Sequence, residues 1–241
     1  MKTLYLESVD STNKWVKDHI GKLDDMTLVY TYNQTNGRGR LNRIWNYTGK
    51  DNIYASILLK PSGAIGEVYS NLTQYLCIVL INTLEEYNIF PKIKWPNDIL
   101  VNGKKISGIL AESIGLKSNG TADGIVIGFG VNLNTTTEVL NKINQPATSL
   151  NIEIGKTVDK ELFLKKVNDK FCLMYHRFID EGFLLIREEY LQKSAFINSN
   201  ISVKVFDKII SGRVTGLTDD GALKIVDNNN KEQILLIGDI L

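Results

Sequence analysis

The order of apolar and polar positions divides the chain into a long part of mixed character and a short β-rich end. Two long segments, 67–87 and 159–179, carry apolar residues every three and four positions, which predicts helices with one buried face. In the second helix we expect Leu162, Met174 and Phe178, among others, to point inward. Shorter helices are expected at 12–20 and 183–192, and strands at 4–6, 27–32, 52–59, 93–111 and 124–134. The segment 135–150 is polar and is predicted to be a loop.

The end of the chain contains only short apolar runs separated by turn residues. The four predicted strands lie at 201–205, 209–214, 222–226 and 233–237. Several short strands in close succession favour a small antiparallel barrel. A plausible boundary at 195–199 divides the chain into a domain of residues 1–194 and a domain of residues 195–241.

The segment 93–111 predicts a β-hairpin, because Asn102-Gly103 stands between two apolar runs. The expected facing pairs are Val101 with Lys104, Leu100 with Lys105, Asp98 with Ser107 and Asn97 with Gly108. This register makes Asp98 and Lys105 diagonal neighbours on one face of the hairpin. Taken singly, such charges also occur on solvated strand faces, so the hairpin alone does not establish a site.

Two glycines in the strand at 124–134 are two residues apart and therefore lie on one face of the predicted sheet. Gly128 and Gly130 leave that face without side chains. A flat ligand lying on the strand is one explanation, and a helix packed closely against it is the other. A dinucleotide fingerprint is not complete here, since a third glycine and a following helix are missing.

The segment 34–45 combines glycines and arginines between two strand-like runs. Gly37 and Gly39 alternate with Arg38 and Arg40, and Arg43 follows. Glycine lets a backbone approach a ligand closely, and guanidinium groups match phosphate and carboxylate. An anion-binding loop is therefore one interpretation. A solvated basic loop or a nucleic-acid-binding segment is the other.

Composition narrows these alternatives. The 241 residues include 43% apolar and 23% charged residues, which is ordinary for a globular protein. The net charge of +1 gives no global attraction to nucleic acid or to an acidic membrane, so an anion site must be local. Two isolated cysteines, Cys77 and Cys172, fit buried free thiols in a reducing, cytoplasmic setting. We find no signal peptide and no apolar run long enough to span a bilayer.

Taken together, the motifs resemble those of the biotin protein ligase family. They are Asp10-Ser11-Thr12-Asn13, Gln34 with Gly37-Arg38-Gly39-Arg40, Arg43 with Trp45, Lys94-Trp95-Pro96-Asn97-Asp98, Lys105-Ile106-Ser107-Gly108-Ile109-Leu110 and Gly128-Phe129-Gly130-Val131-Asn132. They occur in the family's order, and the resemblance extends to Gly238-Asp239-Ile240 near the end of the chain. It implies an α+β fold, in which helices pack on one face of a mixed or antiparallel sheet, followed by a small SH3-like β-barrel.

The resemblance also implies a reaction. Biotin and ATP form biotinyl-AMP and pyrophosphate, and a lysine of a biotin carboxyl carrier protein then takes the biotin. This would be the biotin–[acetyl-CoA-carboxylase] ligase reaction. A carboxylate that attacks a phosphate brings two anions together, so the protein must neutralise and align them.

The family's site residues carry over to matching positions of this sequence. Lys105 and Arg38 are the implied catalytic residues. Those implied for biotin are Ser11, Thr12, Gln34, Gly37, Arg38, Gly39, Arg40, Lys105, Gly108, Gly128 and Gly130. Those implied for ATP are Arg40, Arg43, Trp45, Lys94, Asn97, Asp98 and Asn132. Asp98 is also the candidate ligand for Mg²⁺, which binds oxygen atoms.

The sequence departs from the family pattern in two places. Asp10-Ser11-Thr12 comes almost at once, so we expect a ligase without the winged helix-turn-helix that many relatives carry, and therefore without a nucleic-acid partner. The near-neutral charge and the lack of a long apolar run give the expectation of no membrane partner. Leu41, Asn42 and Ile44 stand where the family loop often has glycine and basic residues, which affects loop closure. A homodimer through edge strands is compatible with the family. The alternative functions are a lipoate or octanoate ligase and a non-catalytic biotin sensor.

Overall fold

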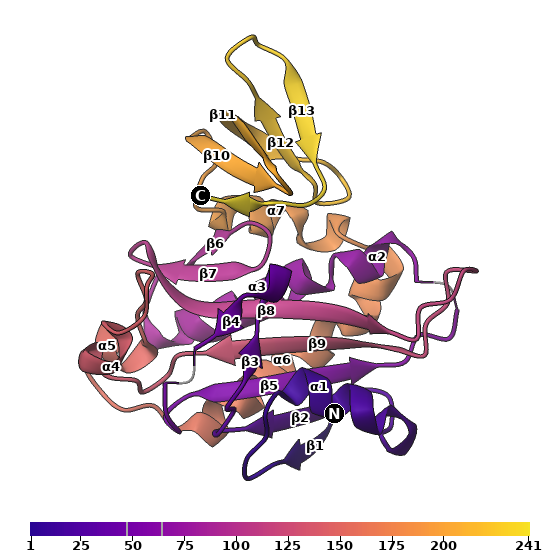
Figure 1. The fold of residues 1–241 in the computed structure, drawn as a ribbon, viewed down its shortest axis with the longest axis vertical. Coiled ribbons are helices and arrows are strands. Elements are labelled where there is room, and N and C mark those ends of the chain that lie inside the picture. Colours follow the sequence, from indigo (N-terminus) through magenta and orange to yellow (C-terminus); the bar gives the residue numbers. More distant parts are fainter. Residues whose placement is uncertain (47, 64) are drawn as a thin grey trace.

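A seven-stranded sheet forms the centre of the molecule (Figure 1). The computed structural model describes residues 1–46, 48–63 and 65–241, without the side chains of Asn42 and Glu67. The sheet order is β1-β2-β5-β9-β8-β7-β6. Its strands are β1 (Lys2–Tyr5), β2 (Thr27–Thr31), β5 (Ile53–Leu59), β6 (Lys92–Lys94), β7 (Asp98–Val101), β8 (Lys104–Ile114) and β9 (Gly124–Val131). Only β1 and β2 run parallel among these pairs, so the expected mixed sheet is confirmed.

One face of this sheet is covered by long helices. They are α3 (Leu72–Leu84), α6 (Lys160–Glu181) and α7 (Leu184–Lys193). The Tyr75 and Phe178 rings stack at 4.5 Å between α3 and α6, and both side chains are almost fully buried. Alternate residues of β5, such as Ile53 and Ile57, join the same core. The apolar periodicity of the two long segments therefore predicts the correct faces, apart from Leu162, which is 48% exposed.

The segment 67–87 is interrupted rather than continuous. It consists of α2 (Glu67–Ser70), α3 and a 3₁₀ turn at Glu85–Tyr87. The break falls at Asn71, where ψ is 2° and the side chain donates to the carbonyl of Asp220. Asn88 ends the segment in the left-handed region, as asparagine often does after a helix.

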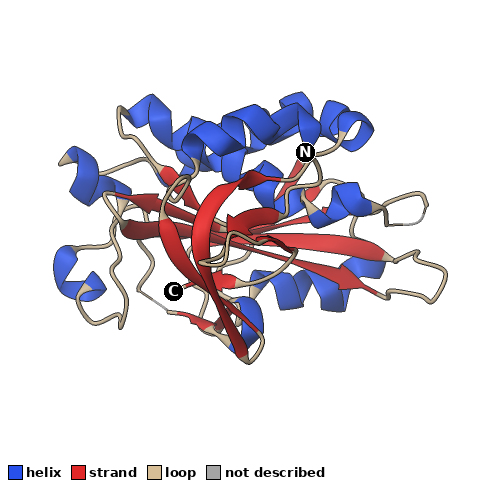
Figure 2. Cartoon of the chain, turned by 90° about the horizontal axis from the view of Figure 1, so that it is seen from above, coloured by secondary structure: helices blue, strands red, loops and turns tan. Residues whose placement is uncertain are grey.

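The opposite face of the sheet carries α1 (Thr12–His19), followed by a 3₁₀ turn at Ile20–Lys22. Val16 of this helix packs with Val29, Leu58 and Val126 in a separate small core. Figure 2 shows helices above and below the sheet. The resemblance implied helices on one face only, whereas in the structure α1 covers part of the other face.

The hairpin of β7 and β8 has the predicted turn but a different register. Asn102 and Gly103 both have positive φ, 50° and 76°, which matches a type I′ turn. Leu100 faces Lys105 as expected. A bulge then shifts the pairing, so that Asp98 faces Gly108 rather than Ser107. The predicted pairs of Asp98 with Ser107 and of Asn97 with Gly108 are therefore wrong.

The segment 135–150 is not entirely a loop. It contains the short helix α4 (Thr137–Leu140), and α5 (Leu150–Ile154) begins at its end. The isolated bridge between Lys105 and Ala147 ties this segment to the start of β8. The segment is therefore fixed against the strand that carries Lys105.

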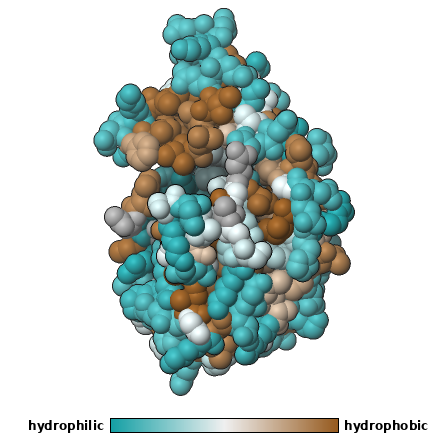
Figure 3. All heavy atoms as spheres, turned by 90° about the vertical axis from the view of Figure 1, so that its right-hand side faces the viewer, coloured by the Kyte–Doolittle hydropathy of each residue, from teal (hydrophilic) through white to brown (hydrophobic). Residues whose placement is uncertain are grey.

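The last part of the chain forms a second, antiparallel sheet in the order β13-β12-β11-β10-β14. Its strands are β10 (Asn200–Val205), β11 (Lys208–Leu217), β12 (Leu223–Val226), β13 (Glu232–Leu235) and β14 (Asp239–Ile240). Four of them were expected, and β14 is additional. Among the described residues β13 and β14 form the edges, so the sheet is open and not a closed barrel. Apolar side chains gather on its surface above a hollow (Figure 3).

The two sheets share one hydrophobic core. Val203, Val214 and Leu223 of the second sheet belong to the same buried cluster as the α3 and α6 residues. Trp95 Nε1 donates to the carbonyl oxygen of Gly221 at 3.2 Å, and Gln74 Nε2 donates to it at 2.9 Å. The C-terminal sheet is therefore packed firmly on the β6 side of the main sheet.

Candidate active site

A single large pocket collects nearly all the residues that the motifs predict. It holds about 1240 Å³ of empty space, part of it open to solvent, on the α1 face of the main sheet. Every predicted site residue lines it except Gly37. Gly37 has a different reason to be glycine: a Cβ there would lie 2.8 Å from both Gln34 Nε2 and the Trp45 carbonyl oxygen.

The floor of the pocket is a patch of glycines on neighbouring strands. Gly108 of β8 pairs with Gly130 of β9. The Trp45 indole lies directly on them, since a Cβ at either glycine would be 2.7–2.8 Å from its ring atoms. Gly128 instead faces α1, where a Cβ would come within 2.1 Å of Asn13 Oδ1. Gly128 therefore fits the explanation of close helix packing, whereas Gly130 leaves room for the Trp45 indole, and a flat ligand on the strand stays a prediction.

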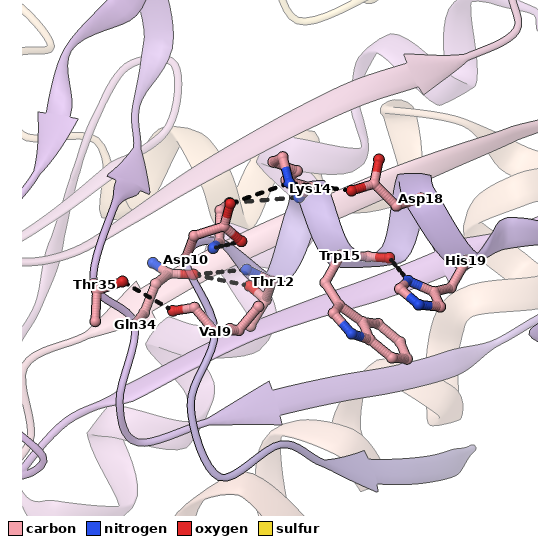
Figure 4. A network of polar contacts seen from close by, with 10 residues as sticks. Val9, Asp10, Thr12, Lys14, Trp15, Asp18, His19, Gln34 and Thr35 are labelled. Atoms are coloured by element: carbon pink, nitrogen blue, oxygen red, sulfur yellow. Dashed lines mark hydrogen bonds and ion pairs between the residues drawn. The ribbon is translucent and has the colours of Figure 1, made fainter.

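One end of the pocket is built from hydrogen-bonded neutral side chains at the start of α1. Ser11 caps the helix by accepting from the Lys14 amide at 3.4 Å. Gln34 Oε1 accepts from the Thr12 amide at 2.9 Å and lies 3.2 Å from its hydroxyl (Figure 4). The bridge between Val9 and Gln34 holds the two segments side by side. This end therefore offers oriented hydrogen-bond partners without charge.

The middle of the pocket contains an ion pair. Lys105 Nζ lies 2.7 Å from Asp98 Oδ2, and both side chains are about four-fifths buried. The shifted register produces this contact, because it brings Asp98 opposite Gly108 and therefore close to the Lys105 side chain. The ammonium also lies 5.3 Å from the centre of the Trp45 ring. Burial lowers the pKa of Lys94, and the nearby Asp98 carboxylate opposes this effect.

The other end of the pocket is formed by the basic loop, which contains β3 (Gly37–Arg38), a 3₁₀ turn at Arg40–Asn42 and β4 (Ile44–Trp45). Arg40 donates to Asn97 Oδ1 at 3.1 Å and to the Gly238 carbonyl at 3.2 Å. Both Arg40 and Arg43 pair with Asp239, at 3.4 and 2.9 Å. The C-terminal sheet therefore contributes an anion to the basic end of the site.

Arg38 lines the pocket with an exposed side chain. Leu41 and Ile44 are exposed by 64% and 70%, and Leu41 has a positive φ of 51°. The side chain of Asn42 lies outside the described part of the structure, so its expected effect on loop closure stays a prediction.

Several residues of the site have no role in the sequence-based prediction, among them the polar residues Asn13, Ser56 and Asp239. Asn13 belongs to the Asp10–Asn13 motif and lines the pocket, and Asp239 belongs to the Gly238–Ile240 motif. Ser56 is fully buried directly beneath the lining. Its only signal in the sequence is a polar residue within the apolar run at 52–59. The signal for Asp239 was present, but the sequence does not show which distant side chains meet it.

The acidic residues of the pocket bear on metal binding. Among residues 1–46, 48–63 and 65–241, no group of three or more His, Cys, Asp or Glu side chains is close enough to hold a metal ion. Asp98 and Asp239 both line the pocket. One or two carboxylates together with substrate phosphates are a usual set of Mg²⁺ ligands. The donor set therefore fits a metal that arrives with a nucleotide better than a resident metal.

In the described part of the chain, no helix is long and apolar enough to cross a membrane.

Comparison with known proteins gives consistent matches. A model of the Biotin/lipoate A/B protein ligase family matches residues 5–132, and a model of the Biotin protein ligase C terminal domain matches residues 196–241. The chain is 27% identical over 234 residues to the Bifunctional ligase/repressor BirA of Bacillus subtilis (strain 168), covering 96% of this chain and 71% of BirA. It is 29% identical over 224 residues to the Biotin--[acetyl-CoA-carboxylase] ligase of Paracoccus denitrificans, covering 90% and 91%.

The fold gives the same result. The solved structure of the biotin protein ligase from Aquifex aeolicus in complex with biotin and ATP matches with a TM-score of 0.84 at 26% identity, covering 100% of this chain and 97% of that one. The expected α+β fold with a small antiparallel C-terminal domain is thereby confirmed. Since the first family model alone covers more than half of the sequence, the chain belongs to the biotin/lipoate A/B protein ligase family.

Proposed function

We propose that this protein is a biotin protein ligase that makes biotinyl-5′-AMP from biotin and ATP and transfers biotin to a lysine of a biotin carboxyl carrier protein. The observation that carries the proposal is the polarity of the pocket. A buried neutral end at Thr12 and Gln34 lies opposite a basic end at Arg40 and Arg43, with Lys105 between them. This order matches a substrate with a neutral ring, a carboxylate and a triphosphate partner.

In the first step, a carboxylate oxygen of biotin attacks the α-phosphorus of ATP. An O–P bond forms, and the bond to the β,γ-pyrophosphate breaks. Lys105 and Arg38 act as the catalytic residues by neutralising the two approaching anions. The 2.7 Å pair of Lys105 with Asp98 holds the ammonium in the middle of the pocket before the substrates arrive.

In the second step, the neutral amine of the acceptor lysine attacks the biotinyl carbonyl carbon. The C–N bond forms, the bond to the AMP oxygen breaks, and the amine loses a proton. The pocket's opening to solvent gives the lysine side chain access to the mixed anhydride.

We assign biotin to the α1 end of the pocket. Its ureido ring would bind Ser11, Thr12 and Gln34. Gly108, Gly128 and Gly130 would act by leaving room for the side chains that lie against them, which are Trp45 at Gly108 and Gly130 and Asn13 at Gly128. The resemblance adds the backbone of Gly37 and Gly39 and the side chain of Arg40. Gly37 would act indirectly, because it lets Gln34 and Trp45 approach each other.

We assign ATP to the other end. Arg40, Arg43 and Lys94 would bind phosphates, and Trp45 would cover the adenine. Asn97, Asp98 and Asn132 complete this side. Asp98 would bind a Mg²⁺ ion that arrives with ATP and supplies further charge neutralisation. We also propose that residues 1–194 form the catalytic domain and that residues 195–241 help to close the basic end of the pocket.

The partner is the acceptor domain of a biotin-dependent carboxylase, for which acetyl-CoA carboxylase is our candidate. Two free cysteines, with Cys77 buried, are compatible with a reducing, cytoplasmic location. A homodimer through the edge strand β1 is a further part of the proposal, since β1 has a neighbour on one side only in the described sheet.

The test is a mass measurement of purified acceptor domain after incubation with the protein, ATP and Mg²⁺ and, in separate reactions, biotin, lipoate or octanoate. We expect the mass increase of one biotinyl group and no other product. Transfer of lipoate or octanoate without biotin would contradict the proposal. Biotin binding without pyrophosphate release would identify a sensor instead.

A further inference from the structure

We propose that Ser56 is a positioning residue that makes the Thr12 hydroxyl a hydrogen-bond acceptor for one ureido N–H of biotin. Ser56 lies on β5, is completely buried and does not line the pocket. The inference rests on the proposed function, because it assumes that the α1 end of the pocket binds the ureido ring. It concerns the direction of the hydrogen bonds there, which follows from the donors and acceptors of the neighbouring residues.

The first fixed group is the Asn13 amide. Its Nδ2 donates to the Leu110 carbonyl oxygen at 3.2 Å and to Glu112 Oε2 at 2.8 Å. A carbonyl and a carboxylate only accept, so the NH₂ group of Asn13 must face them. Lys17 also pairs with Glu112 and holds this carboxylate in place. The Asn13 Oδ1 atom therefore points the other way, as an acceptor.

Ser56 supplies the donor for that oxygen. Its Oγ lies 2.6 Å from Asn13 Oδ1 and 2.7 Å from Thr12 Oγ1. The hydroxyl has one hydrogen to give. Donating it to Thr12 would leave the buried Asn13 oxygen without a hydrogen-bond donor, which is unfavourable. The hydrogen therefore goes to Asn13, and Ser56 Oγ becomes an acceptor toward Thr12.

The Thr12 hydroxyl hydrogen is then used inside the protein. Its two neighbours are Ser56 Oγ and Gln34 Oε1, which lies at 3.2 Å. Gln34 Oε1 must face Thr12, because the Thr12 amide at 2.9 Å can only donate. Both neighbours accept, so the Thr12 oxygen offers only lone pairs to the pocket. A ligand N–H fits there, and a ligand acceptor is repelled.

The experiment compares biotin with two analogues in which a ring oxygen replaces one or the other ureido N–H. These analogues keep the ring shape and exchange a donor for an acceptor. Binding of each is measured by calorimetry to the wild type, to Ser56→Ala and to Thr83→Val. Thr83 is the matched control, because it is a fully buried hydroxyl on α3, across the sheet from the pocket, and bonds to the Val79 carbonyl.

For the wild type we expect biotin to bind more tightly than both analogues. In Ser56→Ala the affinity for biotin should fall roughly fivefold to tenfold, because the Thr12 hydroxyl loses the nearer of its two acceptors and is held only by Gln34 Oε1 at 3.2 Å. The preference of Ser56→Ala for biotin over the analogue whose ring oxygen lies next to Thr12 should fall by about the same factor, since the Thr12 hydroxyl can now donate to that ring oxygen. Thr83→Val should keep the wild-type preference even if its melting temperature falls.

An unchanged preference in Ser56→Ala would overturn the inference and leave Ser56 with a packing role. An equal loss of preference in Thr83→Val would overturn it as well, because the effect would then be general. If the wild type itself fails to bind biotin, the proposed function is wrong. The three results are therefore distinguishable.

Discussion

The two ends of the pocket are built on different principles. The α1 end consists of neutral side chains that are at most 8% exposed, namely Thr12, Asn13, Gln34 and Ser56. They lie on or beside regular elements and hold each other by short hydrogen bonds. The basic end places Arg40 and Arg43 on a loop, and the Arg43 side chain is 60% exposed. Their common partner, Asp239, belongs to another sheet.

This difference indicates a division of labour. Buried, fully paired polar groups are rigid and discriminate by the direction of their hydrogen bonds. Charges on an exposed loop attract an anion but are screened by water, and their ion pairs are worth little each. We therefore expect the α1 end to be preformed and the basic end to depend on which ligands are present.

The largest effect should follow loss of the charge that lies between the two ends. Lys105→Ala removes the ammonium that would face the reacting carboxylate and phosphate, and adenylate formation should fall roughly 100-fold to 1000-fold. Pyrophosphate release measures it. Lys104→Ala, at the exposed neighbouring position on β8, should retain wild-type rates. Normal release by Lys105→Ala would remove this residue from the mechanism.

A smaller effect should separate the basic end from the α1 end. Arg40→Ala removes donors to Asn97 and Gly238 and the pair with Asp239, so the loop should close less tightly over the adenylate. Free biotinyl-AMP should appear roughly tenfold faster without an acceptor, while the affinity for biotin should fall by a smaller factor. Arg177→Ala, which removes an exposed ion pair on α6, is the control. Equal leakage from both variants would contradict the role.

Asp239→Asn tests whether the C-terminal sheet holds the loop before ATP binds. The substitution keeps the size of the side chain and removes its charge, so both arginines lose their partner. Tryptic cleavage within the loop of the ligand-free protein should rise about fivefold, and ATP should restore protection. If cleavage stays at the wild-type rate, the loop is held by other contacts.

The smallest effect concerns pH. Burial lowers the pKa of Lys94, so this ammonium should lose its proton at a lower pH than an ordinary lysine. As the pH rises through that pKa, a positive charge disappears from the basic end, and the KM for ATP should increase. The KM for biotin should change much less. Lys94→Ala should have a higher KM throughout and a flatter profile. Identical profiles for Lys94→Ala and the wild type would exclude this contribution.

Local chemistry in the sequence predicts much of the α1 end and the hairpin. The helix expected at 12–20 is present and is capped by Ser11, and Asn102-Gly103 forms the expected tight turn of the hairpin. Both features depend on interactions within a few residues, which is why the sequence predicts them. The resemblance adds the pocket residues, nearly all of which the structure brings together.

What the sequence does not predict depends on distant partners. The bulge that places Asp98 opposite Gly108 has no local signal, because the turn alone would fix the simple register. Ser56 looks like an irregularity in a strand until Asn13 and Thr12 meet it. Asp239 stands in a recognisable motif, but its contacts with two arginines require the packing of one sheet on another.

The hydrogen bond between Arg40 and Gly238 affects the order in which the protein can fold during its synthesis on the ribosome. The two residues are 198 positions apart, so the loop arginine is synthesised long before its partner emerges. The main sheet, complete at Val131, can pair its strands earlier. In a nascent chain, the sheet that forms the floor of the pocket could therefore form before the Arg40 loop is held in place. We expect activity only after Gly238 has emerged from the ribosome.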